Sequence, residues 1–341
     1  MLASDSIFCI QEFIHEKRVT IPSVKTMCRY PIKGGSNNNR KLFHDTLRLL
    51  FNAGIKPVYC AATLPKSIDW LSLPESVSVY GADLPIERLD RKRIQLDNII
   101  QPIIEIIEYL KHRKSDIKIV EFCSGSGSVA LPLSYMYPSI NFVFIDNKKR
   151  SLLLAKKRSD DAELRNTNFK LGNIEDYDDG FDIGVGLHAC GNASDVIIKK
   201  CIAARACVIV CPCCVGKVNL SNNKKPRSSV FQNIIEGINS SDDLYKNLLK
   251  AADIGHGREN GVDGARSPDS QLRMLSKCYV EEDRRLLIAE NKYTTHLFKM
   301  KPLSCTPKND VLVGIPNGGE FAGFVLMLDP ISDIFDFSKL L

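Results

Sequence analysis

The segment Val120–Gly127, which reads VEFCSGSG, decides the fold of this chain. It overlaps a run of β-branched and apolar residues, Ile117–Cys123 (IKIVEFC), whose composition is typical of a buried strand. The serines and glycines that follow predict a tight turn, because glycine adopts backbone conformations that other residues avoid. Helical spacing resumes at residues 129–138 (VALPLSYMYP). A strand, a small-residue turn and a helix in this order indicate an open α/β sheet.

Further strands alternate with helical segments along the chain. Four lie at or within NFVFID (141–146), NFKLGN (168–173), FDIGVGLHACG (181–191) and ACVIVCPCC (206–214). This alternation predicts right-handed crossovers and a doubly wound, mostly parallel sheet. Two later segments, Tyr293–Met300 and Asp310–Ile315, have strand character. We expect them to pair as an antiparallel edge.

The same signals predict three parts in the chain of 341 residues. Residues 1–83 form an N-terminal extension of uncertain fold that we expect to pack on the main domain. Residues 84–315 form the α/β domain, and residues 316–341 form a C-terminal tail. The polar segment Ser221–Ser241 is predicted to be a mobile loop or lid.

Composition limits the classes of protein to consider. Hydrophobic residues make up 44% of the chain, which is enough for a sizeable core. The net charge of +6 permits a nucleic-acid partner without requiring one. No apolar run approaches the roughly 20 residues that span a bilayer, and the N-terminus lacks a secretory signal. The twelve cysteines are scattered, so we expect a reducing, cytoplasmic location.

The turn after the first strand carries the main functional signal. Open α/β sheets bind ligands beyond the carboxyl ends of their strands. An acidic residue, an apolar residue and small residues ending in G-x-G are typical of enzymes that use S-adenosylmethionine (SAM), and differ from the dinucleotide form. We expect Glu121 to reach the methionine amino group, and Gly125 and Gly127 to pass under the adenosyl group. Ser124 lies in the same turn, and Cys123 stands where many such turns have their first glycine.

The next two strand ends supply candidates for the rest of the pocket. Asp146 ends the second strand about 20 residues beyond the turn, where a carboxylate accepts both ribose hydroxyls; its alternative role is a helix N-cap. Asn147 follows it directly. Asn173 is placed to meet the adenine edge together with Ile174, although an asparagine there also makes turns.

The fourth and fifth strand ends read GLHACG (186–191) and CPCCVGK (211–217). We expect Leu187 and His188 to line the crevice, with His188 either taking a proton from the acceptor or only bonding the loop backbone. The cysteines expected near His188 are Cys123, Cys190, Cys211, Cys213 and Cys214.

Three interpretations of these cysteines stay open. They pack as small, soft side chains, or they bind zinc, or Cys213 or Cys214 acts as a nucleophile on a pyrimidine ring. Because no pair of CxxC knuckles occurs, no metal is predicted.

The motifs in this order resemble the methyltransferase module of the glutathione S-transferase C-terminal domain-containing proteins. The likeness spans about Leu84 to Gly314 and is carried by VEFCSGSG, FIDNKKRSLLLAKKR, FDIGVGLHACGNASD, VIVCPCCVGK and PKND. A broader group includes methyltransferase-like 25 proteins and tRNA 2′-O-methyltransferases of the Trm-thirteen type. The resemblance implies a class I, Rossmann-like SAM-dependent fold and SAM binding through Glu121, Gly125, Gly127 and Asp146.

The resemblance and the residues together predict a SAM-dependent methyltransferase. RNA, either tRNA or rRNA, is the expected substrate by analogy with the tRNA relatives, and the basic segments RLDRKR (88–93) and Lys224–Arg227 favour it. A protein or small-molecule substrate is one alternative, although the N-P-P-Y acceptor motif is absent. A non-catalytic SAM-binding scaffold is the other. The sequence leaves the oligomeric state open.

Overall fold

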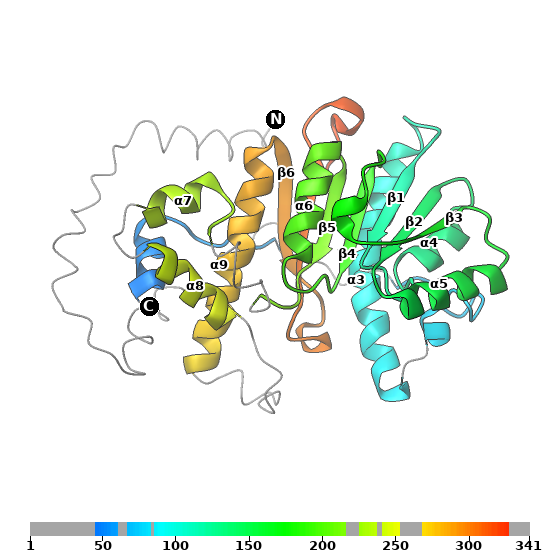
Figure 1. The fold of residues 1–341 in the computed structure, drawn as a ribbon, viewed down its shortest axis with the longest axis horizontal. Coiled ribbons are helices and arrows are strands. Elements are labelled where there is room, and N and C mark those ends of the chain that lie inside the picture. Colours follow the sequence, from blue (N-terminus) through cyan, green and yellow to red (C-terminus); the bar gives the residue numbers. More distant parts are fainter. Residues whose placement is uncertain are drawn as a thin grey trace.

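One mixed sheet organises the described part of the chain, as Figure 1 shows. The computed structural model describes residues 45–60, 67–82, 85–215, 225–236, 241–252 and 268–326. The strands are β1 (Lys118–Phe122), β2 (Asn141–Asp146), β3 (Thr167–Leu171), β4 (Ile183–Leu187), β5 (Cys207–Cys211), β6 (Tyr293–Lys299) and β7 (Asp310–Pro316). Their order in the 7-stranded sheet is β3-β2-β1-β4-β5-β7-β6.

Strands β1 to β5 pair in parallel, and β7 pairs antiparallel with both β5 and β6. The predicted parallel sheet with an antiparallel edge is therefore confirmed. The strand order reverses between β1 and β4, which are neighbours in space. Ligands of open α/β sheets bind at such a reversal, beyond the carboxyl ends of the strands. The turn after β1 and the loop after β4 both lie at this point.

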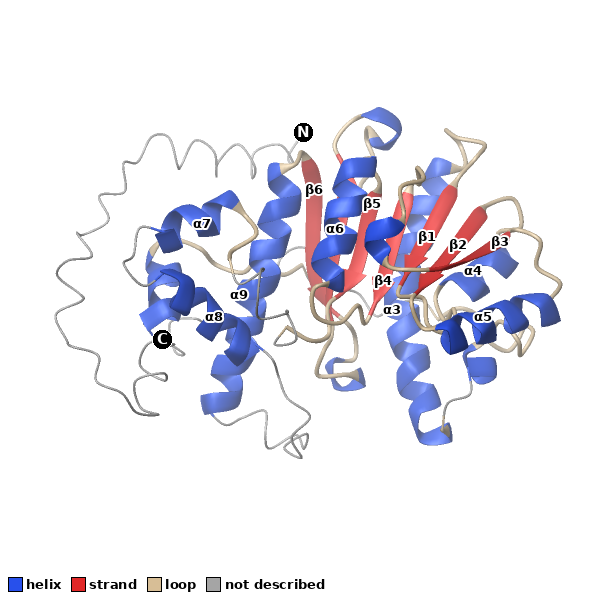
Figure 2. Cartoon of the chain, in the orientation of Figure 1, coloured by secondary structure: helices blue, strands red, loops and turns tan. Residues whose placement is uncertain are grey.

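Helices α3 to α6 and α9 pack on the sheet, and α7 and α8 pack on α9, as Figure 2 shows. They are α3 (Ile86–Leu110), α4 (Ala130–Met136), α5 (Lys149–Asp161), α6 (Ala193–Ala204), α7 (Ser229–Glu236), α8 (Ser241–Ala252) and α9 (Pro268–Glu290). The basic and apolar segments that precede β1 form one continuous helix, α3. Its residues Ile99, Ile103, Ile106 and Leu110 recur at helical spacing and are fully buried in the core. No described helix is both long and apolar enough to cross a membrane.

The lid predicted for Ser221–Ser241 is wrong for its central part. Residues 229–236 form the helix α7, with Phe231 and Ile235 buried against α8 and α9. These two residues are four positions apart and lie on one helical face, which the polar residues around them obscured in the sequence. Residues 221–224 and 237–240 of this segment lie outside the described residues.

The described residues before α3 contact the domain at several points. The Tyr59 hydroxyl donates to Asp310 at 2.8 Å, and the Trp70 indole N–H donates to Asp97 at 2.8 Å. Arg158 of α5 donates to the carbonyl of Ser76 at 2.7 Å. After β7, the ring of Phe324 packs edge-on against Tyr109 of α3, with centroids 4.9 Å apart. These contacts support packing of both ends on the domain, and the three-part division stays a prediction.

Candidate functional site

The turn after β1 has a left-handed backbone at three positions. The φ angles are 53° at Cys123, 55° at Gly125 and 78° at Gly127. A Cβ on Gly127 would lie 2.9 Å from the side chain of Leu131, so glycine is required there for packing. A Cβ on Gly125 would meet nothing within 4 Å. Open space therefore adjoins the turn at Gly125, where a ligand is able to approach the backbone.

Two carboxylates hold this turn in place. Glu121 is 3% exposed and accepts the backbone N–H of Ala130, at the start of α4, at 2.9 Å. Asp146 accepts the N–H groups of Gly125 at 2.8 Å and of Lys148 at 2.7 Å. The structure thus brings together Glu121, the two glycines and Asp146. The alternative role of Asp146 as the helix N-cap is wrong, because Lys148 is the N-cap of α5 and no side chain caps this helix.

Glu121 interacts electrostatically with Lys92, which belongs to the basic segment 88–93 that we expected to favour RNA. Burial raises the pKa of Glu121 to about 7, although the hydrogen bond from Ala130 and the charge of Lys92 both act to lower it. Burial lowers the pKa of Lys92, and the charge of Glu121 opposes this shift. Lys92 is therefore partly buried and near enough to Glu121 for the two charges to interact. Lys92, Gln95 and Ile99 follow the spacing i, i+3, i+7, which was the available signal that they share one buried face.

One buried polar atom beside the turn lacks a partner. Ser124 is 5% exposed, and its Oγ makes no hydrogen bond. Buried hydroxyls are nearly always hydrogen-bonded, so an unpaired one in this turn fits a site for a polar ligand. The residues present therefore fit SAM: small residues at the turn, an unpaired donor beside it, and carboxylates on two strand ends.

The predicted adenine end is a compact polar cluster. Asn147 donates to the side-chain oxygen of Asn173 at 3.4 Å. Asn173 also forms a capping box with Asp176 at the start of a short 3₁₀ helix, Ile174–Asp176. The alternative role of Asn173 as a turn residue is therefore present. Ile174 and Leu187 are each 8% exposed and supply apolar surface.

His188 begins the loop after β4 and has a left-handed backbone, with φ of 58°. Its backbone N–H donates to the carbonyl of Cys211 at 3.1 Å. Its imidazole Nε2 lies 2.8 Å from Oε1 of Gln95. Because an amide oxygen only accepts, Nε2 carries the proton and Nδ1 is the acceptor. Burial and the charges of Lys92 and Lys308 lower the pKa of His188 to about 4, so the ring is neutral.

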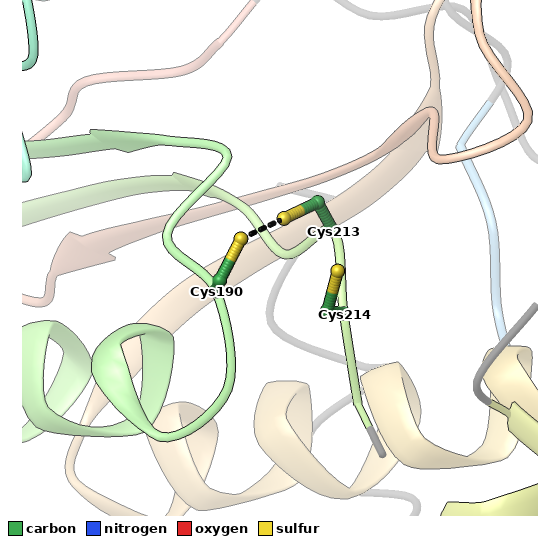
Figure 3. Close-up of side chains that lie close together, drawn as sticks. All are labelled: Cys190, Cys213 and Cys214. Carbon is green, nitrogen blue, oxygen red and sulfur yellow. Dashed lines mark hydrogen bonds between the residues drawn. The ribbon is translucent and has the colours of Figure 1, made fainter. Parts of the chain in front are cut away.

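Three of the expected cysteines lie close together, as Figure 3 shows. The sulfur atoms of Cys190, Cys213 and Cys214 all lie within 4.8 Å of one another. Cys211 does not join them, because its Sγ points to the carbonyl of Lys308 at 3.5 Å. The hydrogen bond with Cys190 and burial raise the pKa of the Cys213 thiol, which disfavours the thiolate form that a nucleophile needs. Cys123 lies near Cys190, because the electrostatic interaction with Cys190 contributes to raising the pKa of the Cys123 thiol.

A network of buried charges fixes the CPCC loop and α6 to α9. Asp195 of α6 accepts from Arg227 at 2.7 Å and from Arg284 at 2.7 Å. Lys277 pairs with Glu281 at 2.6 Å and donates to the carbonyl of Pro212 at 3.2 Å. The prediction that Arg227 favours RNA binding is wrong, because its side chain is only 7% exposed and is paired inside the protein. Sequence spacing gives no signal for such long-range pairs.

Comparison with known proteins identifies the domain. Residues 91–221 match a family described as "Methyltransferase domain". The chain carries a SAM-dependent methyltransferase domain. The chain is similar to the mouse glutathione S-transferase C-terminal domain-containing protein, with 35% identity over 278 residues that cover 80% of this chain and 40% of that protein. It is also 35% identical over 272 residues to the Drosophila melanogaster homolog, covering 79% and 43%.

The chain thus spans less than half the length of these relatives, and the family resemblance is confirmed. Among solved structures, the methyltransferase domain is similar to magnesium protoporphyrin IX methyltransferase from Synechocystis PCC 6803 with bound SAH. That similarity has 10% identity and a TM-score of 0.41, and covers 70% of this chain and 91% of the other. The parallel β1–β5 core with the antiparallel β7 inserted beside β5 is the class I arrangement.

Proposed function

We propose that this domain transfers the methyl group of SAM to an acceptor held at the carboxyl edge of β4 and β5. The observation that carries the proposal is the turn after β1. There, Ser124 has a buried Oγ without a partner, and a Cβ on the next residue, Gly125, would meet open space. A purely structural turn has no need of either feature, whereas a polar ligand lying across the turn uses both.

The residues of the turn would hold SAM in a defined orientation. Asp146 accepts the ribose hydroxyls through lone pairs that its two backbone bonds leave available. Glu121 would face the ammonium group of the SAM methionine, and Lys92 would face the carboxylate of that methionine. The charges of Glu121 and Lys92 already interact, so the two side chains lie near each other. Around the base and the sulfur the proposed contacts are Asn147, Asn173, Ile174, Leu187, Cys123 and Ser124. SAM supplies an activated methyl group on a sulfonium.

His188 is proposed as the residue that orients the acceptor. Gln95 fixes the imidazole through Nε2, and Nδ1 then accepts a hydrogen bond from the acceptor O–H or N–H. This aligns an acceptor lone pair for in-line transfer, which is mainly a matter of positioning. Cys213 and Cys214 follow β5 on the same edge, so we propose that they line the acceptor side rather than attack it.

RNA is the acceptor class that we propose. Exposed cations lie on two helices near the site: Arg88 and Arg91 on α3, which carries Gln95, and Lys149 and Arg150 at the start of α5, which follows Asp146. Phosphate contacts of this kind supply most of the sequence-independent affinity for RNA. A cytoplasmic location belongs to the same proposal.

A double substitution tests the role of the cations. Lys149→Gln with Arg150→Gln should weaken RNA binding and flatten its salt dependence. Lys156→Gln with Lys157→Gln is the matched control, because those lysines of α5 already pair with Asp160 and Asp161. Equal RNA affinity for the two double variants would remove these cations from the interface.

Tritiated SAM identifies the acceptor. The chain is incubated with total RNA, total protein and the small-molecule fraction of a lysate. The proposal predicts label that ribonuclease removes and protease does not. Label in the protein or small-molecule fraction would assign one of the alternative substrates. Binding of S-adenosylhomocysteine (SAH) without label in any fraction would indicate a non-catalytic scaffold.

A further inference from the structure

The three thiols at the ends of β4 and β5 form a cluster that methyl transfer does not require. Cys190 belongs to the loop after β4, and Cys213 and Cys214 to the loop after β5. Two backbone hydrogen bonds hold the loops side by side, from His188 to Cys211 and from Gly191 to Cys214, each at 3.1 Å. The cluster is therefore fixed by the sheet rather than by chance contact of exposed side chains.

The three thiols lie close enough together to share one metal ion. A tetrahedral zinc site places each sulfur about 2.3 Å from the metal, so its sulfurs lie roughly 3.7 Å apart. The sulfurs of Cys190 and Cys213 are 2.8 Å apart, which is shorter than this spacing, and all three sulfurs lie within 4.8 Å of one another. The side chains shown in Figure 3 point toward a common centre. Small rotations of the side chains would bring three sulfurs onto one ion.

The surroundings of the cluster also fit a bound ion. Three thiolates around a divalent cation carry one net negative charge. Nζ of Lys308 lies 3.0 Å from Sγ of Cys214 and would balance that charge with an N–H···S hydrogen bond. Cys213 and Cys214 are 7% and 8% exposed, whereas Cys190 is exposed, which gives an ion a route of entry.

We propose that Cys190, Cys213 and Cys214 form a binding site for a thiophilic divalent cation, with zinc as the ion that soft thiolate ligands favour. On binding, the three thiols release three protons to solvent and three sulfur–metal bonds form. Within the described residues no fourth histidine, cysteine or carboxylate joins the group. Water takes the remaining tetrahedral position, the arrangement of zinc sites that keep an exchangeable ligand.

This proposal does not depend on the proposed function, because its readouts use neither SAM nor acceptor. The full chain is purified in reducing buffer, dialysed against metal-free buffer and analysed for zinc by plasma mass spectrometry. We expect one zinc per chain. Replacement of zinc by cobalt should produce sulfur-to-cobalt charge-transfer absorption and the visible bands of tetrahedral cobalt.

Single serine variants locate the ion. Cys190→Ser and Cys214→Ser should each weaken zinc binding at least tenfold in a competition with a chromophoric chelator. Cys60→Ser is the matched control, because Cys60 is a partly exposed thiol beside a ring nitrogen of His296, at 3.9 Å, away from the cluster. Circular dichroism checks that each variant is folded, and Cys190, as an exposed residue, should tolerate the change.

Two results would overturn the proposal. One is a metal-free chain that takes up no cobalt. A disulfide between Cys190 and Cys213, which peptide mapping would detect, would have this effect. The other is zinc that binds equally well to wild type and to Cys190→Ser.

Discussion

The amide oxygen of Gln95 accepts a hydrogen bond from the imidazole of His188 at 2.8 Å, across 93 residues of sequence. This contact joins α3 to the loop after β4. It fixes both the orientation of the ring and the nitrogen that carries its proton. His188 itself has a left-handed backbone, so the loop and the helix together determine where the imidazole points.

Gln95→Leu should therefore impair turnover more than SAM binding. The ring of His188 would lose its fixed orientation, and kcat should fall about 10-fold to 100-fold. The dissociation constant for SAH should stay close to that of wild type. Gln101→Leu is the control, because Gln101 lies on the same helix and bonds only Glu105 there. An unchanged kcat in Gln95→Leu, measured in single-turnover assays, would exclude this positioning role.

Glu121 should make cofactor affinity depend on pH. Its pKa of about 7 lies above the ordinary value of 4.5, so the ligand-free domain holds this proton up to about pH 7. The stability of the ligand-free domain should consequently fall as pH rises between these values. A bound ammonium favours the ionised carboxylate, so binding releases the proton below pH 7.

Affinity for SAH should therefore rise by up to about tenfold per pH unit below pH 7 and level off above it. Calorimetry across this range measures the slope. Glu121→Gln should lose this part of the pH dependence, and any slope that remains belongs to the ligand. Equal slopes for wild type and Glu121→Gln would mean that Glu121 does not face the ammonium.

Replacing Gly127 should mainly lower stability, whereas replacing Gly125 should mainly lower SAH affinity. Gly127→Ala places a methyl group against Leu131 and Phe144 in a left-handed backbone, so unfolding free energy should fall by about 2–4 kcal/mol. Gly125→Ala meets no neighbour and should cost only about 1–2 kcal/mol for its backbone conformation. Its methyl group would enter the open space, however, and SAH affinity should fall at least tenfold. Urea titration and calorimetry separate the two effects.

Asp195→Asn should destabilise the domain strongly. Two buried guanidinium groups, Arg227 and Arg284, would lose their shared carboxylate, and breaking a buried pair costs about 3–5 kcal/mol. These arginines hold the pKa of Asp195 well below its usual range against the opposing effect of burial. The wild-type domain should therefore lose this stability only in strong acid. Asp160→Asn, at an exposed pair with Lys156, should cost less than about 0.5 kcal/mol in the same denaturation experiment.

The strands could be predicted from the sequence, because β-branched runs such as residues 207–211 strongly favour a buried strand. The antiparallel edge and the gathering of Glu121, Gly125, Gly127 and Asp146 followed from that topology. The helix α7 was missed, since only Phe231 and Ile235 mark its buried face.

The contributions of Lys92 and Gln95 were missed for a different reason. Both are polar residues in a basic segment, and local composition suggested a solvated surface. Their side chains reach Glu121 and His188 only because α3 packs on the sheet with that face inward. The helical spacing of Lys92 and Gln95 indicates a shared face of α3, but the partners of that face depend on tertiary packing, which spacing does not encode. The pairs of Asp195 with Arg227 and Arg284 are hidden for the same reason.

The central claim is that the turn after β1 and Asp146 bind SAM. Calorimetric titration with SAH tests it most directly, by comparing wild type with two aspartate variants. Asp146→Ala removes the proposed ribose ligand, and Asp182→Ala removes a carboxylate that similarly accepts a backbone N–H, from Lys118 at 2.8 Å, at the opposite end of the sheet. Loss of a charge-assisted hydrogen bond costs about 1.5–3 kcal/mol. We predict one SAH per chain for wild type and Asp182→Ala, and at least tenfold weaker binding for Asp146→Ala. Equal affinity in all three proteins, or no binding by wild type, would contradict the account.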